Sequence, residues 1–203
     1  HADAYSHLLE VLGLNDDCTQ LLQTPVIQGR VDYLTKYLKG AAGNTDESFA
    51  LMLTLFSIFV ENVSLFSQFL VIKSFNKYKN VLKDVDNVVQ ATAKEETIHA
   101  LLGVEIINII RKEFPEWFNE EFHHKIVRAC KKAYEAEEKI IDWIFENGDL
   151  ETITAYEVKE FTKDRSNNSL KLIGYEPIFE VDKEVLNKLL WFNEEMLADT
   201  AYD

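Results

Sequence analysis

Two short patterns in this chain contain residue types that bind metal ions in helical proteins. Glu96 and His99 stand three residues apart, so a helix would place both side chains on one face. Glu61 is the only charged residue between Phe49 and Ile72. An unpaired charge in such an apolar run costs several kcal/mol unless something compensates it. A metal ion held between Glu61 and the Glu-x-x-His pair would do so, as in helical bundles that bind carboxylate-bridged metals.

A Glu-x-x-His pair is a weak signal by itself, because the two residues also meet at this spacing on exposed helix surfaces. Here the flanking residues are apolar around most of the helix, while Thr92, Glu96, His99 and Gly103 fall on one stripe. We therefore expect this stripe to be interior and interpret its Glu and His as ligands together with Glu61. Oxygen and imidazole ligands without thiolate favour iron or manganese over a structural zinc site.

His1 and Tyr5 stand four residues apart, which places them on one face of a helix. Taken alone, His1 is best interpreted as an ordinary terminal residue. If it is a ligand, however, Tyr5 lies one turn from the metal, and redox-active iron beside a buried tyrosine is suited to oxygen chemistry.

The composition favours a helical protein. The chain has 203 residues, of which 47% are apolar, with only seven Gly and three Pro. Two cysteines, Cys18 and Cys130, without metal-type spacing predict a reducing compartment, the cytoplasm. A net charge of −14 argues against nucleic acid or an anionic membrane as a direct partner.

The run from Phe49 to Ile72 is long enough to span a bilayer, but its polar content favours a buried central helix. The polar residues of this run are Ser57, Glu61, Asn62, Ser64, Ser67 and Gln68. Hydrophobic periodicity and turn residues predict the other helices, and no strand pattern of useful length occurs. The predicted helices are 2–14, 31–38, one from Asp46 through the apolar run, one carrying Glu96 and ending near Phe114, 118–147, 158–173 and 182–196. We predict a single all-α domain.

Four motifs in order give the chain a resemblance to the small, radical-generating subunit of class I ribonucleotide reductase. They are His1-Ala2-Asp3-Ala4-Tyr5, Glu61 within its apolar run, Lys94-Glu95-Glu96-Thr97-Ile98-His99, and the C-terminal set Arg165-x-Asn167-x-x-Leu170, Leu172-Ile173-Gly174 and Trp191-Phe192. The resemblance covers nearly the whole chain. It implies a ferritin-like helical bundle whose di-metal centre activates dioxygen and oxidises a tyrosine to a stored radical. A large subunit then uses this radical to reduce ribonucleotides to deoxyribonucleotides for DNA replication.

The resemblance also implies residue roles and partners. Tyr5 would carry the radical, Leu65 and Phe69 would exclude water from it, and the cofactor would be two iron ions, or manganese and iron. By resemblance the ligands are His1, Glu61, Glu96 and His99, and Glu95 would support the histidine matched by His1. The expected partners are the large catalytic subunit and a second copy of the small subunit.

The chain departs from the family pattern at its N-terminal end. Two further carboxylate ligands are expected upstream of His1, so residues 1–203 are predicted to form a ferritin-like domain that lacks its first helices. A separate or missing N-terminal portion would supply those ligands. Glu95 also replaces the usual aspartate. Two alternatives remain at this stage: another ferritin-like di-metal oxidase or hydroxylase, and an iron-storage or purely structural helical bundle.

Overall fold

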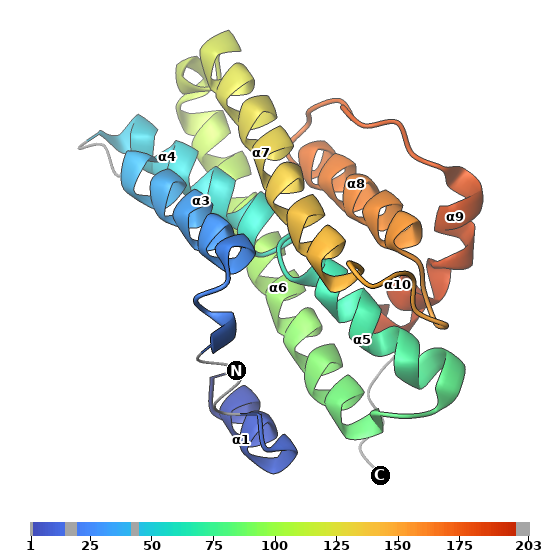
Figure 1. The fold of residues 1–203 in the computed structure, drawn as a ribbon. Coiled ribbons are helices and arrows are strands. Elements are labelled where there is room, and N and C mark those ends of the chain that lie inside the picture. Colours follow the sequence, from blue (N-terminus) through green and yellow to red (C-terminus); the bar gives the residue numbers. More distant parts are fainter. Residues whose placement is uncertain (1, 15–19, 42–44, 198–203) are drawn as a thin grey trace.

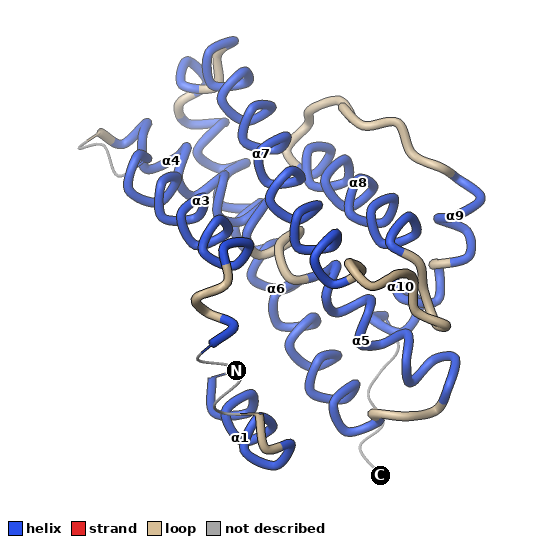
Figure 2. Tube along the Cα trace, viewed as in Figure 1, coloured by secondary structure: helices blue, strands red, loops and turns tan. Residues whose placement is uncertain are grey.

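The computed structural model describes residues 2–14, 20–41 and 45–197, and within these ranges the chain is a bundle of helices without a strand (Figures 1 and 2). The elements in chain order are α1 (Ala2–Leu12), α3 (Pro25–Ala41), α4 (Asp46–Leu55), the π-helix η1 (Phe56–Val60), α5 (Phe66–Lys79), α6 (Lys83–Glu113), the 3₁₀ turn η2 (Pro115–Trp117), α7 (Glu120–Ile144), α8 (Ala155–Leu172), α9 (Lys183–Lys188) and α10 (Leu190–Leu197). The predicted all-α class is confirmed.

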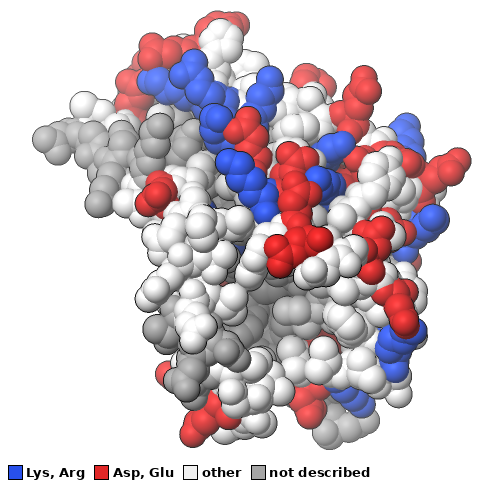
Figure 3. Space-filling model, viewed as in Figure 1, with Lys and Arg blue, Asp and Glu red and all other residues white. Residues whose placement is uncertain are grey.

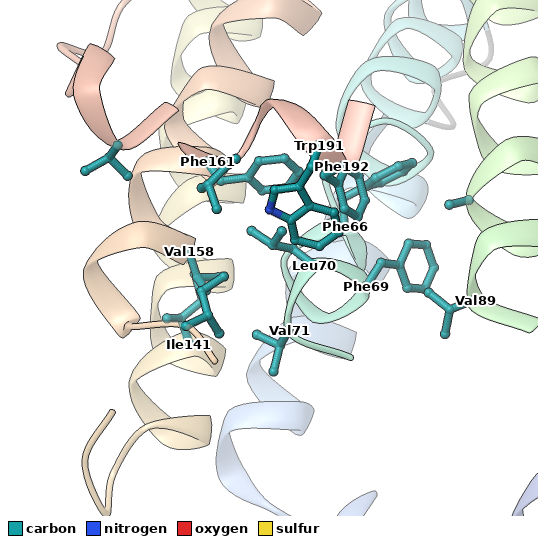
Figure 4. Close-up of a cluster of buried hydrophobic side chains, with 14 of the residues drawn as sticks. Phe66, Phe69, Leu70, Val71, Val89, Ile141, Val158, Phe161, Trp191 and Phe192 are labelled. Carbon is teal, nitrogen blue, oxygen red and sulfur yellow. The ribbon is translucent and has the colours of Figure 1, made fainter. Parts of the chain in front are cut away.

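The long helix α6 runs along the bundle, and the other helices are arranged around it and α7. Helices α4 and α5 and the π-helix η1 all pack against α6, while α3 and α8 pack against α7 (Figure 1). Two apolar clusters fill the space between them. The first, shown in Figure 4, joins α5 to α8 and α10 through residues such as Phe66, Leu70 and Phe192. The second joins η1 to α6 and α7 through Ile58, Ile107 and similar residues.

The predicted single helix over the apolar run is wrong, because the chain interrupts it in the middle. Helix α4 ends at Leu55, a π-helical segment follows, and residues 61–65 form a turn before α5 begins at Phe66. Leu65 closes this turn with a left-handed backbone, φ +78°. An uninterrupted apolar helix and an interrupted one have the same hydrophobic pattern, so periodicity alone did not distinguish them.

The C-terminal helices lie where they are predicted, but the last one is not continuous. The predicted helix 182–196 is divided at Leu189 into α9 and α10. Thr154 begins α8 with a capping box, in which its hydroxyl accepts from the backbone of Glu157 while that residue's carboxylate accepts from Thr154 N. Gly148, with φ +107°, follows α7.

Charged side chains of both signs lie next to one another over the upper and right parts of the face seen in Figure 3. Lys159 lies 2.7 Å from Asp142, and Lys125 lies 2.8 Å from Glu121. Within the described ranges, no helix combines the length and the apolar character needed to cross a membrane.

Candidate metal centre

The π-helix positions Glu61. Five residues from Phe56 to Val60 are wound more widely than an α-helix, so the Glu61 amide donates to Phe56 O, five residues back, at 3.1 Å. This segment packs very closely on α6. A Cβ atom at Gly103 would lie only 1.9 Å from Ser57 Oγ, so no side chain fits there unless the neighbouring segment moves. Gly103 therefore allows the backbone that presents Glu61 to approach α6.

The turn after Glu61 is fixed by α8. Arg165 Nε donates to Asn62 O at 2.7 Å, and its Nη2 donates to Asn62 Oδ1 at 2.8 Å. Asn62 Nδ2 donates in turn to Ser169 Oγ at 2.8 Å. The Arg165 guanidinium also lies 3.5 Å from the centre of the Phe66 ring. These contacts hold the residue next to Glu61 by its carbonyl oxygen and by both polar atoms of its side chain, so the chain after Glu61 is fixed on α8 as the chain before it is fixed on α6.

Glu61, Glu96 and His99 come together, as predicted. One ligand atom from each lies within 4.8 Å of the other two. His99 Nδ1 is 3.4 Å from Glu61 Oε2 and 3.6 Å from Glu96 Oε2. Glu96 and His99 are i and i+3 on α6, and Glu61 reaches them from the turn after η1.

The electrostatics of Glu61 fit a bound cation. Burial raises the pKa of Glu61 above its usual value; the negative charge of Glu96 raises it further, and His99 lowers it. Among the described residues, Glu61 Oε2 is buried without a hydrogen-bond partner. A buried carboxylate oxygen without a donor is costly. A cation between the two glutamates and the imidazole would remove that cost, and the oxygen and nitrogen donors match iron or manganese.

The expected interior position holds for part of the α6 stripe only. Thr92 and Gly103 are buried, and the Glu96 side chain is 18% exposed. The His99 side chain, in contrast, is 54% exposed, which corrects the expectation that it is interior. The reason is that no described helix covers this side of α6, where the neighbouring Ile98 is also 64% exposed. The cluster of Glu61, Glu96 and His99 is thus covered by the bundle on the side of the two glutamates and exposed to solvent on the side of His99.

Tyr5 reaches the same helix from α1. Its hydroxyl donates to Thr92 Oγ1 at 3.2 Å, one turn before Glu96 on α6. The ring is partly buried, and this burial raises the pKa of Tyr5, as does the nearby charge of Glu96. This contact places the Tyr5 hydroxyl on the α6 stripe that also carries Glu96, and the role of Tyr5 as the radical tyrosine stays a prediction.

The remaining predicted site residues are less closely connected to the cluster. His1 lies outside the described residues, and Glu95, expected to support it, is exposed. Phe69 is buried in the core, where Figure 4 shows its ring beside Val89 of α6. Leu65 is 41% exposed, so its expected role in excluding water has no support from burial.

Sequence reasoning did not assign a role to Gly103 or Arg165. Gly103 lies on the same α6 stripe as the ligands, and a glycine in a helix interior is itself a signal of close packing. Arg165 was noted only as part of a C-terminal motif. Its partner Asn62 is 103 residues away, so no local pattern connects the two.

A helical bundle in which one glutamate from one segment meets a Glu-x-x-His pair from another is typical of the ferritin-like carboxylate proteins. The comparisons with known proteins agree. Residues 1–186 match the family model described as ribonucleotide reductase, small chain. The chain therefore belongs to the ribonucleotide reductase small-chain family.

The relatives that the chain matches are longer than the chain. It is 26% identical to a probable ribonucleoside-diphosphate reductase small subunit from Invertebrate iridescent virus 3, covering 98% of this chain and 56% of the viral protein. It is 27% identical to the ribonucleoside-diphosphate reductase subunit beta of Chlamydia pneumoniae, covering 68% of this chain and 38% of the relative.

The fold is also similar to that of a solved structure. A Bacillus halodurans protein described as a class I ribonucleotide reductase superposes with a TM-score of 0.81 at 18% identity, covering 94% of this chain and 68% of that one. At this identity the similarity concerns the fold alone, and it confirms the predicted ferritin-like bundle.

Proposed function

We propose that this chain is the metal-binding and tyrosine-bearing part of a ribonucleotide reductase small subunit. The observation that supports this most directly is the convergence of Glu61, Glu96 and His99 around a carboxylate oxygen that the described chain leaves without a donor. Family membership supplies the reaction class. Two iron ions are the proposed cofactor, with manganese and iron as the alternative, because the donor set suits both.

Glu61, Glu96 and His99 would hold the metals from the bundle side. When bound, the metals would supply dioxygen activation and accept one electron from Tyr5. The task of the chain is to hold its ligands in place and to keep Tyr5 near them. The contacts of Asn62 with α8 and the close fit of η1 against Gly103 serve the first task. The hydrogen bond of Tyr5 to α6 serves the second.

We further propose that an N-terminal portion, separate or missing from this sequence, covers the open side of the cluster and supplies two more carboxylates. The uncovered face of α6 supports this, because it is apolar along several turns beside the exposed His99. The exposed apolar residues at helical spacing on this face are Ile98, Leu102, Ile106 and Ile109. Exposed apolar surface of this kind marks an interaction site in a folded protein.

The proposed partners of the completed protein are a large catalytic subunit, which uses the radical to make deoxyribonucleotides, and a second small subunit. Family membership supports both proposals. We propose the cytoplasm as its location, since Cys130 is a free thiol and thiols persist in reducing compartments. The net charge of −14 supports neither nucleic acid nor an anionic membrane as a partner.

The test uses the chain complemented with the N-terminal portion of a family relative, loaded with ferrous iron and then exposed to oxygen. We expect bound metal, an electron paramagnetic resonance signal of a tyrosyl radical, and nucleotide reduction when the large subunit is added. Tyr5→Phe should abolish the signal and the reduction while leaving metal content almost unchanged, because phenylalanine keeps the packing and loses only the hydroxyl.

The outcomes separate the candidate functions. Metal binding with oxygen consumption but no radical would indicate a related di-metal oxidase. Accumulation of many iron ions per chain would indicate storage. Full reductase activity of Tyr5→Phe would show that the oxidising equivalent is not stored on Tyr5.

A further inference from the structure

The hydroxyl of Tyr5 has a specific polar partner. The resemblance implies that apolar residues, Leu65 and Phe69, surround the radical tyrosine. In the structure, the Tyr5 hydroxyl lies 3.2 Å from Thr92 Oγ1, and Leu65 is 41% exposed. Thr92 is itself buried, at 5% exposure, in the middle of α6. The phenol oxygen is therefore engaged by a buried alcohol.

The direction of this hydrogen bond follows from a second bond. The Thr92 hydroxyl donates to the backbone oxygen of Val88, four residues earlier on α6, at 3.0 Å. A threonine hydroxyl carries one hydrogen, so that hydrogen is already used. The oxygen of Thr92 can only accept from Tyr5, and the phenol hydrogen must point at it. A phenol is protonated at neutral pH and able to donate, and burial raises the pKa of Tyr5 further from that range.

The backbone bond also makes Thr92 a rigid partner. Threonine on a helix divides between two χ1 rotamers, and the bond to the i−4 carbonyl selects one of them. Glu96 follows one turn later on the same stripe of α6. The chain Tyr5–Thr92–Val88 therefore connects α1 to the helix that carries two of the proposed ligands, and it does so through atoms of fixed position.

We propose that Thr92 is the positioning residue of Tyr5: it accepts the phenol hydrogen bond and fixes the ring on α6 one turn before Glu96. The functional value of this contact rests on the proposed function, since a tyrosine that exchanges an electron with a metal centre needs a constant distance from it. The contact itself does not depend on the metal. It can therefore be measured in metal-free protein.

The experiment uses the full chain, metal-free, with tyrosine labelled with ¹³C at Cζ, the ring carbon that bears the hydroxyl. The Tyr5 resonance is assigned as the one missing in Tyr5→Phe. Thr92→Val keeps the side-chain shape and removes the acceptor, so it should shift the Tyr5 resonance by more than its line width. Thr92→Ser keeps the hydroxyl and should return the resonance to its wild-type position.

Thr97 provides a matched control on the same helix. Its hydroxyl also donates to the carbonyl four residues earlier, Ala93 O, at 2.8 Å. Thr97→Val should therefore perturb α6 in the same way and leave the Tyr5 resonance unmoved. An unshifted resonance in Thr92→Val would overturn the proposal. Equal shifts in Thr92→Val and Thr92→Ser would also overturn it, because packing of the methyl group would then be the cause.

A second measurement keeps this proposal separate from the proposed function. In iron-loaded, complemented protein, the hyperfine splitting of the tyrosyl radical depends on the angle of the ring to its methylene group. This splitting should change in Thr92→Val and return in Thr92→Ser. If wild type forms no radical while the labelled resonance behaves as expected, the proposed function fails and the positioning role of Thr92 stands.

Discussion

Glu137 is a buried glutamate of the bundle and Glu61 a partly buried one, and the chain compensates their charges differently. Glu137 on α7 is 1% exposed and accepts hydrogen bonds from Arg30, Ser67 and Gln68. Glu61 has a buried oxygen without a donor in the described part of the chain and lies beside a second carboxylate, Glu96. Burial alone therefore does not identify a metal ligand. Glu61 differs from Glu137 in its neighbours, which are a second carboxylate, Glu96, and the imidazole of His99 in place of an arginine.

The largest effect on stability is expected at the compensated glutamate. Glu137→Ala leaves Arg30, whose side chain is 13% exposed, without its carboxylate. Removing one partner of a buried pair costs about 3–5 kcal/mol, so the free energy of unfolding should fall by that amount with or without metal. Urea unfolding in a chelator measures it.

Glu135→Ala is the control for this prediction, because Glu135 pairs with Lys132 on the exposed side of the same helix. Its cost should be below about 0.5 kcal/mol. Equal costs at the two positions would show that the Arg30 contact is not what stabilises Glu137.

The next largest effect on stability is expected where the backbone before Glu61 packs on α6. Gly103→Ala places a methyl group against Ser57, and overpacking of this kind costs about 1–3 kcal/mol. In a Ser57→Gly background the cost should be smaller, because the clashing side chain is gone. Thermal unfolding of the single and double variants measures the coupling.

Gly29→Ala is the matched control, since a Cβ atom there has nothing within 4 Å. It should leave stability unchanged or raise it by up to about 1 kcal/mol, because alanine restricts the unfolded chain. A Gly103→Ala cost that is independent of Ser57 would contradict the close fit of η1 on α6.

The difference between the two glutamates is tested most directly by replacing Glu61. In metal-free protein, Glu61→Ala should leave the free energy of unfolding unchanged or raise it by up to about 1 kcal/mol, because it removes a partly buried carboxylate that lies beside Glu96 and whose Oε2 has no hydrogen bond in the described chain. Affinity for ferrous iron should fall at least about tenfold, since even residues that only support a ligand contribute about 10–100-fold. Anaerobic iron titration and urea unfolding measure the two quantities. Marked destabilisation of the metal-free variant would make Glu61 a structural residue, like Glu137.

The smallest expected effect is on the pH dependence of metal-free stability. The folded pKa of Glu61 is raised above its ordinary value of 4.5, so the folded state binds the proton more tightly than the unfolded state. The contribution of Glu61 is therefore full below pH 4.5 and is lost as pH rises through the raised pKa. The free energy of unfolding of wild type minus that of Glu61→Gln, measured at a series of pH values, should show this decline. A flat difference would contradict the raised pKa.

The sequence was informative where one residue differed from all its neighbours. Glu61 is the only charge of its apolar run, and Glu96 and His99 share a helix face, so their meeting could be predicted. Glu137 could not be recognised, because α7 carries other glutamates in an amphipathic pattern and the partner Arg30 is 107 residues away. The sequence separation hides this contact from any local pattern.

The positions of the helices could be predicted from the sequence, but the points at which two of them are interrupted could not. Helix positions followed from hydrophobic periodicity and from turn residues, which are local signals. The break in the apolar run lies where the chain approaches α6 most closely, at Ser57 and Gly103, which are far apart in the sequence. The pattern of the run around these residues gives no periodic signal for such a break.

The π-helix also has a consequence for how this chain is aligned with its relatives. One turn that closes over five residues contains one residue more than a regular α-helical turn, which is equivalent to a single-residue insertion. Each residue of an α-helix turns the chain by about 100°. If a relative lacks this extra residue, an alignment without a gap matches a neighbour of Glu61 to the residue that points toward the second helix. A one-residue gap between Phe56 and Val60 restores the match to Glu61. The position of Glu61 in such an alignment is therefore checked by the direction of its side chain in space as well as by its order in the sequence.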